Sequence, residues 1–250
     1  MQHTLSYPSV KSSSPWPWVM LPARSMLFVT FQALFALEFY LTGSTTACEA
    51  GASWWPFVVI ITNLVGLIVL IRLYQVEGKR FWDVFRVERQ HILGDLLLLV
   101  GIFAIGGPLA YFPNVLLAGW LFDDPQTVLT MFVRPLPLWA AWASIVIFPI
   151  TQGLVEIATY MAYVMPRTEA QGLRPWQAVL LSGIFLGIQH AAAPLLFDGR
   201  FFLWRLLMYV PFACWVAVLM RWRPRLLPYI AVIHALMNMS FATMFLSMAY

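Results

Sequence analysis

Long apolar runs dominate this chain, and short polar segments separate them. A helix that crosses a bilayer needs about 20 predominantly apolar residues. By that measure we predict spanning helices near residues 25–42, 54–74, 92–112, 137–165, 177–195, 204–220 and 228–248. A further apolar stretch at 113–122 is too short to span, so it would form a re-entrant or interfacial piece. The pattern predicts an all-α, polytopic membrane bundle of about seven transmembrane helices, or eight elements with 113–122.

Basic residues are distributed unevenly between the two sides of this layout. If successive spans alternate in direction, twelve of the fifteen Lys and Arg residues fall on one side, Arg24 among them. The other side carries only Arg134, Arg200 and Arg205. Lys and Arg concentrate in the cytoplasmic loops of membrane proteins. We therefore expect the N-terminus in the cytoplasm and the C-terminus outside.

The overall composition agrees with a membrane location. The chain is 61% hydrophobic and 10% charged, whereas soluble domains average about 25% charged residues. So few charges cannot cover a surface that faces water, and the lipid bilayer is the expected surroundings. We predict a polar tail over 1–24 and a single transmembrane domain over 25–250. No basic run is interleaved with aromatic residues on a polar face, so nucleic acid is not an expected partner.

A few polar side chains interrupt the predicted spans. Residues 155–167, VEIATYMAYVMPR, place Glu156 in an otherwise apolar run. His190 lies in the fifth predicted span, and His234 with Asn238 lies in the last. Ionisable groups inside a membrane are rare and usually functional, and the i, i+4 spacing puts His234 and Asn238 on one helix face. These side chains would hydrogen-bond best by converging on one wet cavity.

One Glu, two His and one Asn fit three kinds of chemistry. A carboxylate and an imidazole can activate water while other donors hold the oxyanion. His and Glu can bind a metal ion, and such groups can also form a proton or ion path. The chain has no HExxH and no GxSxG, and Cys48 and Cys214 are far apart. The common forms of zinc hydrolysis and covalent Ser or Cys catalysis are therefore disfavoured.

The three-helix pattern resembles the CAAX-processing and bacteriocin-processing intramembrane protease family, also called the abortive-infection family. Its members carry three motifs on successive helices: Glu-Glu-x-x-x-Arg, an aromatic residue four positions before a His, and His-x-x-x-Asn. The third motif is intact here as HALMN, which contains His234 and Asn238. The second keeps His190, with Leu186 at the aromatic position and Phe185 beside it.

The first motif can be placed in two registers. Glu156 is either the second acid, with Val155 in place of the first, or the first acid, with Ile157 and Met161 in place of the second Glu and the Arg. In the latter register residues 163–167, YVMPR, fall on the family's Tyr-Leu-x-Pro-Arg without a gap. We adopt it, because losing an acid and its i, i+4 basic partner together leaves no unpaired buried charge.

The resemblance covers roughly residues 137–245 and implies an intramembrane glutamate-type endopeptidase of a cell membrane, such as the bacterial inner membrane. It implies that Glu156 and His190 activate water, and that His234 and Asn238 form the oxyanion hole. The implied substrate is a peptide or protein with a hydrophobic or lipidated segment, cleaved near the membrane surface. We expect no cofactor and no bound metal, because Glu156 is the only acid left at the first motif.

Two other functions stay open at this point. A catalytically inactive relative could act as a membrane scaffold, an immunity protein or a subunit of a membrane complex, and the substitutions at Ile157 and Met161 favour this. The retained polar groups argue against it. A small transporter would usually have broken helices and repeated halves, and neither is evident in the sequence.

Overall fold

The computed structural model describes residues 14–250, and every regular element in that range is helical. Residues 1–13, which belong to the predicted polar tail, lie outside the described residues. The first part of the described chain forms α1 (Trp16–Leu41), α2 (Ala47–Ser53), α3 (Trp55–Val76), α4 (Ile92–Phe122) and α5 (Pro125–Phe132). The second part forms α6 (Leu138–Ile157), α7 (Met165–Ala170), α8 (Pro175–Ile188), α9 (Gly199–Leu207), α10 (Val210–Trp222), α11 (Leu227–Ala242) and α12 (Met244–Ser247).

Six helical segments of the described chain are long and apolar enough to cross a membrane. They are Trp16–Leu41, Trp55–Val76, Phe81–Phe122, Leu138–Ala170, Gly199–Trp222 and Pro224–Ser247. The predicted all-helical membrane bundle is thus confirmed. The predicted count of seven is not, because the fifth span corresponds to α8, which has only 14 residues before a 3₁₀ turn, η4 (Gln189–Ala192).

The stretch 113–122 is not a separate re-entrant piece, and that prediction is wrong. It forms the last part of α4, which runs without interruption from Ile92 to Phe122. Pro108 and Pro113 lie inside this helix and do not end it. Membrane helices tolerate proline because neighbouring helices, Ser or Thr side chains and local adjustments of the helix satisfy the backbone groups that proline frees.

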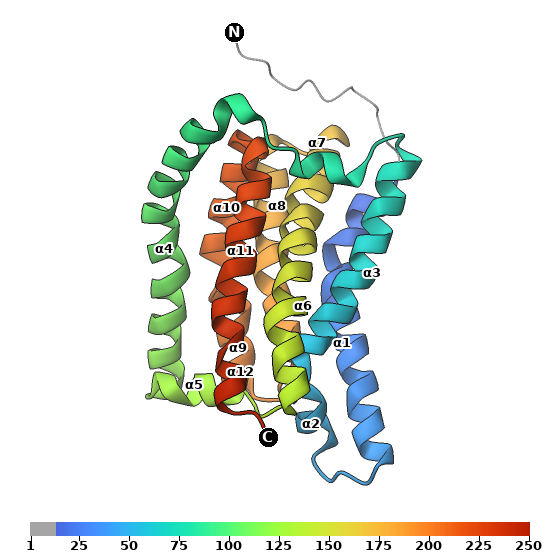
Figure 1. The fold of residues 1–250 in the computed structure, drawn as a ribbon, viewed down its shortest axis with the longest axis vertical. Helices are drawn as coiled ribbons and strands as arrows, with labels where there is room; N and C mark the ends of the chain where they lie inside the picture. Colours follow the sequence, from blue (N-terminus) through green and yellow to red (C-terminus); the bar gives the residue numbers. More distant parts are fainter. Residues whose placement is uncertain (1–13) are drawn as a thin grey trace.

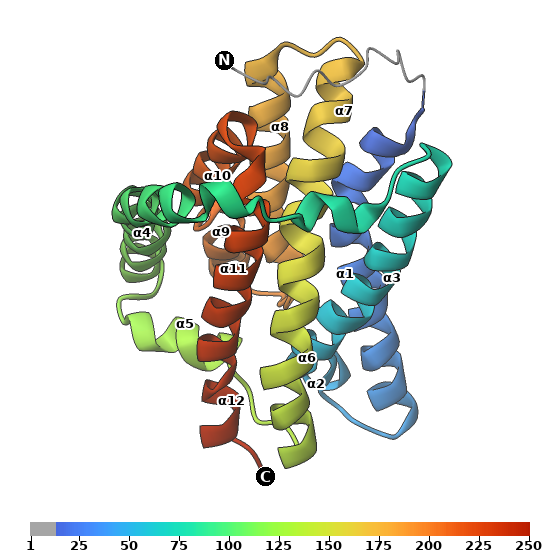
Figure 2. The same cartoon turned by 45° about the horizontal axis from the view of Figure 1, so that its top comes forward.

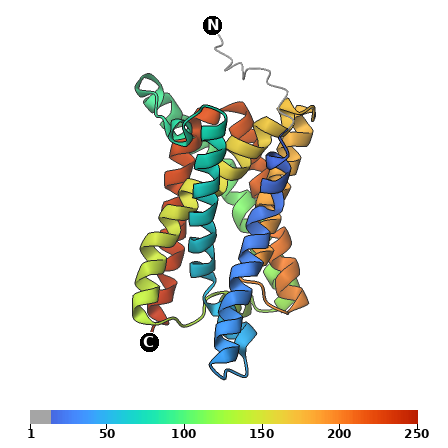
Figure 3. The same cartoon turned by 90° about the vertical axis from the view of Figure 1, so that its right-hand side faces the viewer.

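The centre of the bundle is the pair α6 and α11, which lie side by side (Figure 1). Helices α1 and α3 flank α6, and in the side view of Figure 3 they cover one face of the bundle. Helices α8 and α10 pack together behind the central pair. Helix α4 stands on the outside, and in Figure 2 the short α5 leads from its lower end back beneath the bundle.

Close packing of α6 against α11 depends on a glycine. A Cβ atom added at Gly153 would lie 2.6 Å from the carbonyl oxygen of Ala231 and 3.1 Å from the Cβ of Ala235. Small residues let membrane helices approach closely and gain van der Waals contact. Because α6 carries Glu156 and α11 carries His234, this contact also sets the distance between two candidate site residues.

Helix α4 is fixed to the rest of the bundle near both of its ends. Near its start, buried Asp95 accepts hydrogen bonds from Arg225, whose Nη2 lies 2.8 Å from Oδ1. Further along, the Trp204 indole of α9 donates to the carbonyl oxygen of Asn114 at 3.1 Å. Between these two points α4 packs mainly against α10, which leaves room for a cavity between α4, α10 and α11.

A second ion pair ties α7 to the end of α3. The Arg167 guanidinium donates from Nε and Nη2 to the two carboxylate oxygens of Glu77, at 2.6 Å each. It also lies over the rings of Tyr163 and Tyr74, at 3.9 and 4.7 Å from their centroids. Partial burial alone would raise the pKa of the Glu77 carboxyl, but Arg167, with help from Lys79, lowers that pKa below its ordinary value.

We expect Gly153→Ala to destabilise the protein, because the new methyl group forces α6 and α11 apart. Overpacking of this kind costs about 1–3 kcal/mol, so thermal unfolding in detergent should begin several degrees lower. Gly101→Ala on α4 is the matched control, since a Cβ there meets nothing within 4 Å. Equal unfolding temperatures for the two variants would contradict the close packing.

We also expect the contribution of Glu77 to depend on pH. A carboxyl with a lowered pKa in the folded state stabilises the fold at neutral pH, and this stabilisation is lost as the pH falls through the folded-state pKa. The difference in unfolding temperature between wild type and Glu77→Gln should therefore be largest near pH 7 and should disappear below about pH 4. The control Asp83→Asn, at an exposed carboxylate without an ion pair among the described residues, should give little difference at any pH.

Candidate active site

Glu156 lies at the end of α6, deep inside the bundle, with 1% of its surface exposed. A π-helix over Ala158–Val164 follows it directly. Such wide turns are rare and often occur at functional sites. The neighbouring Ile157 and Met161 are also buried, and both belong to the apolar core. In the register adopted from the sequence, the two positions at which the resemblance implies a Glu and an Arg therefore hold apolar core residues.

Two glutamine side chains hold one oxygen of the Glu156 carboxylate. Gln152, one turn earlier on α6, donates from Nε2 to Oε1 at 2.6 Å. Gln189, at the start of η4, donates from Nε2 to the same oxygen at 2.8 Å. Both glutamines are buried. Oε1 therefore accepts two strong hydrogen bonds, and the carboxylate is fixed from two different helical elements.

The same glutamines connect the carboxylate to a buried guanidinium on α1. Arg24 donates from Nε to Gln189 Oε1 at 2.8 Å and from Nη2 to Gln152 Oε1 at 3.1 Å. Its Nη1 donates to Asn63 Oδ1 at 2.7 Å, and its Nη2 lies 4.0 Å from Glu156 Oε1. A buried charge needs a nearby opposite charge and full hydrogen bonding, and Arg24 with its amides provides both.

This position of Arg24 corrects the sequence prediction, which put the residue in a cytoplasmic loop. Helix α1 begins at Trp16, ahead of the predicted start at residue 25, and Arg24 is 1% exposed. A count of basic residues near span ends cannot separate a loop arginine from one that faces inward from the first turns of a helix. The buried amide partners are what allow Arg24 to lie inside the bundle.

His190 faces the carboxylate from the 3₁₀ turn that follows α8. Its Nδ1 lies 3.0 Å from the carbonyl oxygen of Gly187, and because a carbonyl only accepts, Nδ1 carries the proton. In the neutral ring Nε2 is then an acceptor, and it lies 3.8 Å from Glu156 Oε1. The Tyr209 ring packs against the imidazole with centroids 4.6 Å apart, which fixes its plane.

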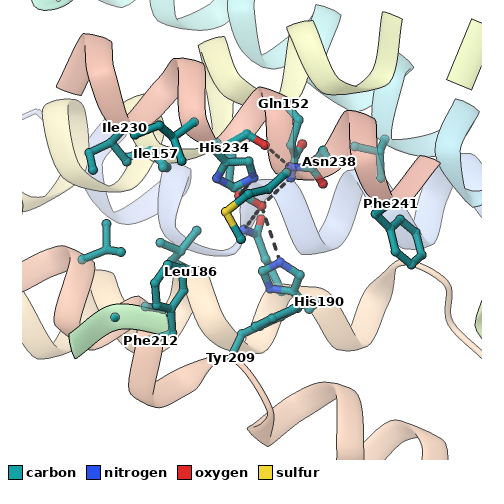
Figure 4. A pocket seen from close by; sticks show the side chains of 18 of the residues that line it. Gln152, Ile157, Leu186, His190, Tyr209, Phe212, Ile230, His234, Asn238 and Phe241 are labelled. Carbon is teal, nitrogen blue, oxygen red and sulfur yellow. Dashed lines mark hydrogen bonds and ion pairs between the residues drawn. The ribbon is translucent and has the colours of Figure 1, made fainter. Parts of the chain in front are cut away.

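His234 and Asn238 face the same carboxylate from α11. His234 Nε2 lies 3.1 Å from Glu156 Oε2. The ring is not aligned for a hydrogen bond, and within the described residues Oε2 is buried without a hydrogen-bond partner. Asn238 donates one amide hydrogen to the carbonyl oxygen of His234 at 2.8 Å, which leaves its second amide hydrogen free. Figure 4 shows His190, His234 and Asn238 turned toward one another.

These polar groups line a cavity of about 270 Å³. The His190 and His234 side chains are each 21% exposed. Beyond His234, on one side, the walls are apolar and come from α4, α8, α10 and α11; Figure 4 labels Leu186, Phe212 and Ile230 there. On the other side lies Phe241, whose ring is near those of Phe132 and Trp55, and all three line the cavity. The site thus lies between an apolar compartment and an aromatic end.

A metal ion does not fit the donor set well. Oε1 of Glu156 already accepts two amide hydrogens, so only Oε2 and the two imidazoles could serve as ligands. In the part of the chain that the structure describes, no group of three or more His, Cys, Asp or Glu residues has a metal-binding arrangement. We therefore derive no chemical step through a metal.

The four residues singled out in the sequence come together in this cavity. The imidazoles of His190 and His234 each lie within 4 Å of the Glu156 carboxylate, and Asn238 lines the same cavity. Arg24, Gln152, Gln189 and Asn63 were missed. The available signal was the presence of amide side chains inside apolar spans, next to His190 in one case and one helical turn before Glu156 in the other.

Comparison with known proteins identifies the segment that carries this site. Residues 137–240 match the family model described as type II CAAX prenyl endopeptidase Rce1-like. The match covers less than half of the chain, but it runs from α6 to α11 and includes all four candidate residues. No curated protein and no solved structure matches the chain. The match over residues 137–240 supports membership of the CAAX-processing intramembrane protease family.

Proposed function

We propose that this multi-pass membrane protein is an intramembrane endopeptidase in which Glu156 is the general base. The observation that supports this most strongly is the state of its two oxygens. Oε1 is held by Gln152 and Gln189, while Oε2 has no hydrogen-bond partner and faces the cavity residue His234 at 3.1 Å. A carboxylate that is fixed through one oxygen and has no hydrogen-bond donor on the other is suited to accept a proton from water.

His190 is the second group that activates the water. Its Nε2 is an acceptor in the neutral ring and lies 3.8 Å from the carboxylate. A water placed beside both groups donates one hydrogen to Glu156 and the other to His190 Nε2. Its oxygen attacks the scissile carbonyl carbon as Glu156 takes the proton. Glu156 then delivers that proton to the departing nitrogen as the carbon–nitrogen bond breaks, and the products are a carboxylic acid, which keeps the second hydrogen of the water, and a free amine.

His234 and Asn238 stabilise the negative charge that develops on the carbonyl oxygen. The His234 Nε2–H and the free amide hydrogen of Asn238 come from one face of α11. Preorganised donors of this kind act strongly in a site that excludes water. His234, which makes no hydrogen bond to the carboxylate, donates to the oxyanion as the tetrahedral intermediate forms.

Loss of the second Glu and the Arg of the first motif does not disable the base, because Arg24 takes over the electrostatic part. It supplies a guanidinium 4.0 Å from Glu156 and reaches the carboxylate through two amides. An inactive scaffold would need no such network, because apolar side chains could fill the same buried space without the free-energy cost of removing charges from water. The network therefore favours an active enzyme over a non-catalytic relative.

The substrate class follows from the apolar compartment of the cavity. Its walls include Ile102, Val216 and Ile230, and it lies between α4, α10 and α11. A lipidated or strongly hydrophobic segment of a peptide would bury itself there and bring the adjoining peptide bond to Glu156. We propose a membrane-associated peptide with such a segment, of the kind that a CAAX prenyl endopeptidase acts on, as the substrate.

The decisive experiment compares wild type with Glu156→Gln. The protein is reconstituted in liposomes, and cleavage of a peptide with an S-prenylated cysteine followed by three residues is measured by mass spectrometry. Loss of a general base lowers the rate by about 100- to 10,000-fold. Glu169→Gln is the control, since Glu169 pairs with Arg221 outside the cavity. If Glu156→Gln cleaves as fast as wild type, the base assignment is wrong.

Arg24→Met should lower kcat with little change in KM, because Arg24 positions the base and does not touch the substrate. We expect a loss of about 10- to 100-fold from the uncompensated carboxylate and amides. Arg24→Lys should restore part of the rate by returning the charge. Arg72→Met, at an exposed arginine of α3, should leave both constants unchanged. A rise in KM at constant kcat would show instead that Arg24 binds substrate.

A further inference from the structure

A second buried arginine, Arg205 on α9, lines the same cavity and has no acidic partner. It is 2% exposed. Its Nε donates to the carbonyl oxygen of His190 at 3.0 Å, and its Nη2 donates to that of Ala193 at 2.6 Å. Its Nη1 has only the Met208 sulfur, 3.9 Å away, and a thioether is a weak acceptor. No carboxylate of the described residues lies within 4.0 Å of it.

This arrangement differs from that of Arg24. Arg24 has three amide acceptors and lies 4.0 Å from Glu156, so its charge is compensated within the protein. Arg205 has no carboxylate of the described residues within 4.0 Å, so Glu156 acts on its charge only from farther away, and a buried charge without a close partner is unfavourable. Two carbonyl contacts explain how the guanidinium is held, but they do not neutralise it. The cavity therefore favours an occupant that brings a negative charge to this wall.

The position of Arg205 limits which negative charge can reach it. Its guanidinium lies 4.3 Å from the centroid of Phe132, whose ring is 5.0 Å from that of Phe241. Arg205 thus belongs to the aromatic end of the cavity, opposite the apolar compartment. His190 also links Arg205 to the proposed base: Arg205 Nε donates to the carbonyl oxygen of His190, and the ring of His190 faces Glu156.

We propose that Arg205 binds the free C-terminal carboxylate of the peptide substrate. The inference rests on the proposed function. With the hydrophobic segment in the apolar compartment and the scissile bond at Glu156, the C-terminal part of the peptide extends toward the aromatic end. A short tail would then place its terminal carboxylate on the Arg205 side of His190, whose carbonyl oxygen accepts from Arg205 and whose ring faces Glu156. A guanidinium presents a planar fork of donors that matches a carboxylate.

Other occupants fit the observations less well. A phospholipid headgroup would place its acyl chains beside its phosphate, whereas the wall around Arg205 is aromatic and the apolar compartment lies beyond the catalytic groups. An acidic side chain within the peptide would carry the same chemistry as a terminal carboxylate. The two differ in whether the chain continues past the charge, and this difference can be tested directly.

The test uses matched peptides with a free or an amidated C-terminus. Wild type should cleave the free acid with a kcat/KM about 10- to 100-fold higher than the amide, as expected for one charge-assisted interaction. Arg205→Met should lose this preference, and Arg205→Lys should keep part of it. The ratio compares two peptides on one preparation, so a smaller folded fraction cancels. Arg200→Met, which removes an exposed arginine from the same helix, should keep the full preference.

Three results would overturn the proposal. Wild type could cleave both peptides equally, or Arg205→Met could retain the wild-type ratio. A third peptide, amidated and ending in Glu, could be cleaved as well as the free acid, which would show that the site reads any carboxylate.

Binding of the same peptides to Glu156→Gln, measured by fluorescence anisotropy in detergent, separates this proposal from the catalytic one. Suppose that wild type cleaves neither peptide, that the free acid still binds about tenfold more tightly than the amide, and that Arg205→Met removes this difference. The carboxylate site then stands and the peptidase function fails. If cleavage depends on Glu156 but neither binding nor rate depends on the terminus, the peptidase function stands and the role of Arg205 is wrong.

Discussion

The arrangement of this bundle depends on one interaction, the holding of the Glu156 carboxylate by two glutamines that also accept from Arg24. Each amide is used at both ends, as an acceptor from the guanidinium and as a donor to the carboxylate. Positive and negative charge are thereby linked without direct contact between them. The network joins α1, α6 and η4, so the position of these elements and the chemical state of the site are set together.

This network also offers a reason why the first motif can differ from the pattern that the resemblance implies. In the register adopted from the sequence, Ile157 and Met161 stand in place of a Glu and an Arg spaced i, i+4 on one helix, and both lie in the apolar core. Arg24 belongs to a different helix and approaches Glu156 through space. Apolar residues thus stand at the two positions on the same helix as Glu156, while Arg24 from another helix keeps a positive charge beside Glu156.

The sequence predicted the helical membrane class and the four cavity residues, because apolar length and isolated polar groups are both local signals. It could not predict that α8 stops after 14 residues, since the tightening to 3₁₀ at Gln189 leaves hydropathy unchanged. It also misplaced Arg24, because a basic residue near a span end usually lies in a loop. Gln152 and Gln189 were missed for a related reason: a neutral amide in an apolar span draws attention only when its charged partners are known.

The two buried arginines show how one cavity can separate catalysis from recognition. Arg24 is saturated by protein acceptors, so its charge acts on Glu156 and is not available to a ligand. Arg205 is held only through backbone carbonyls, and its charge remains available at the aromatic end. Arg205 and the apolar compartment lie on opposite sides of Glu156, His190 and His234, so the two ends of the cavity differ in chemistry. Under the function and the carboxylate site that we propose, a substrate that is hydrophobic at one end and anionic at the other would bind in only one orientation, and that orientation would bring the bond between them to Glu156.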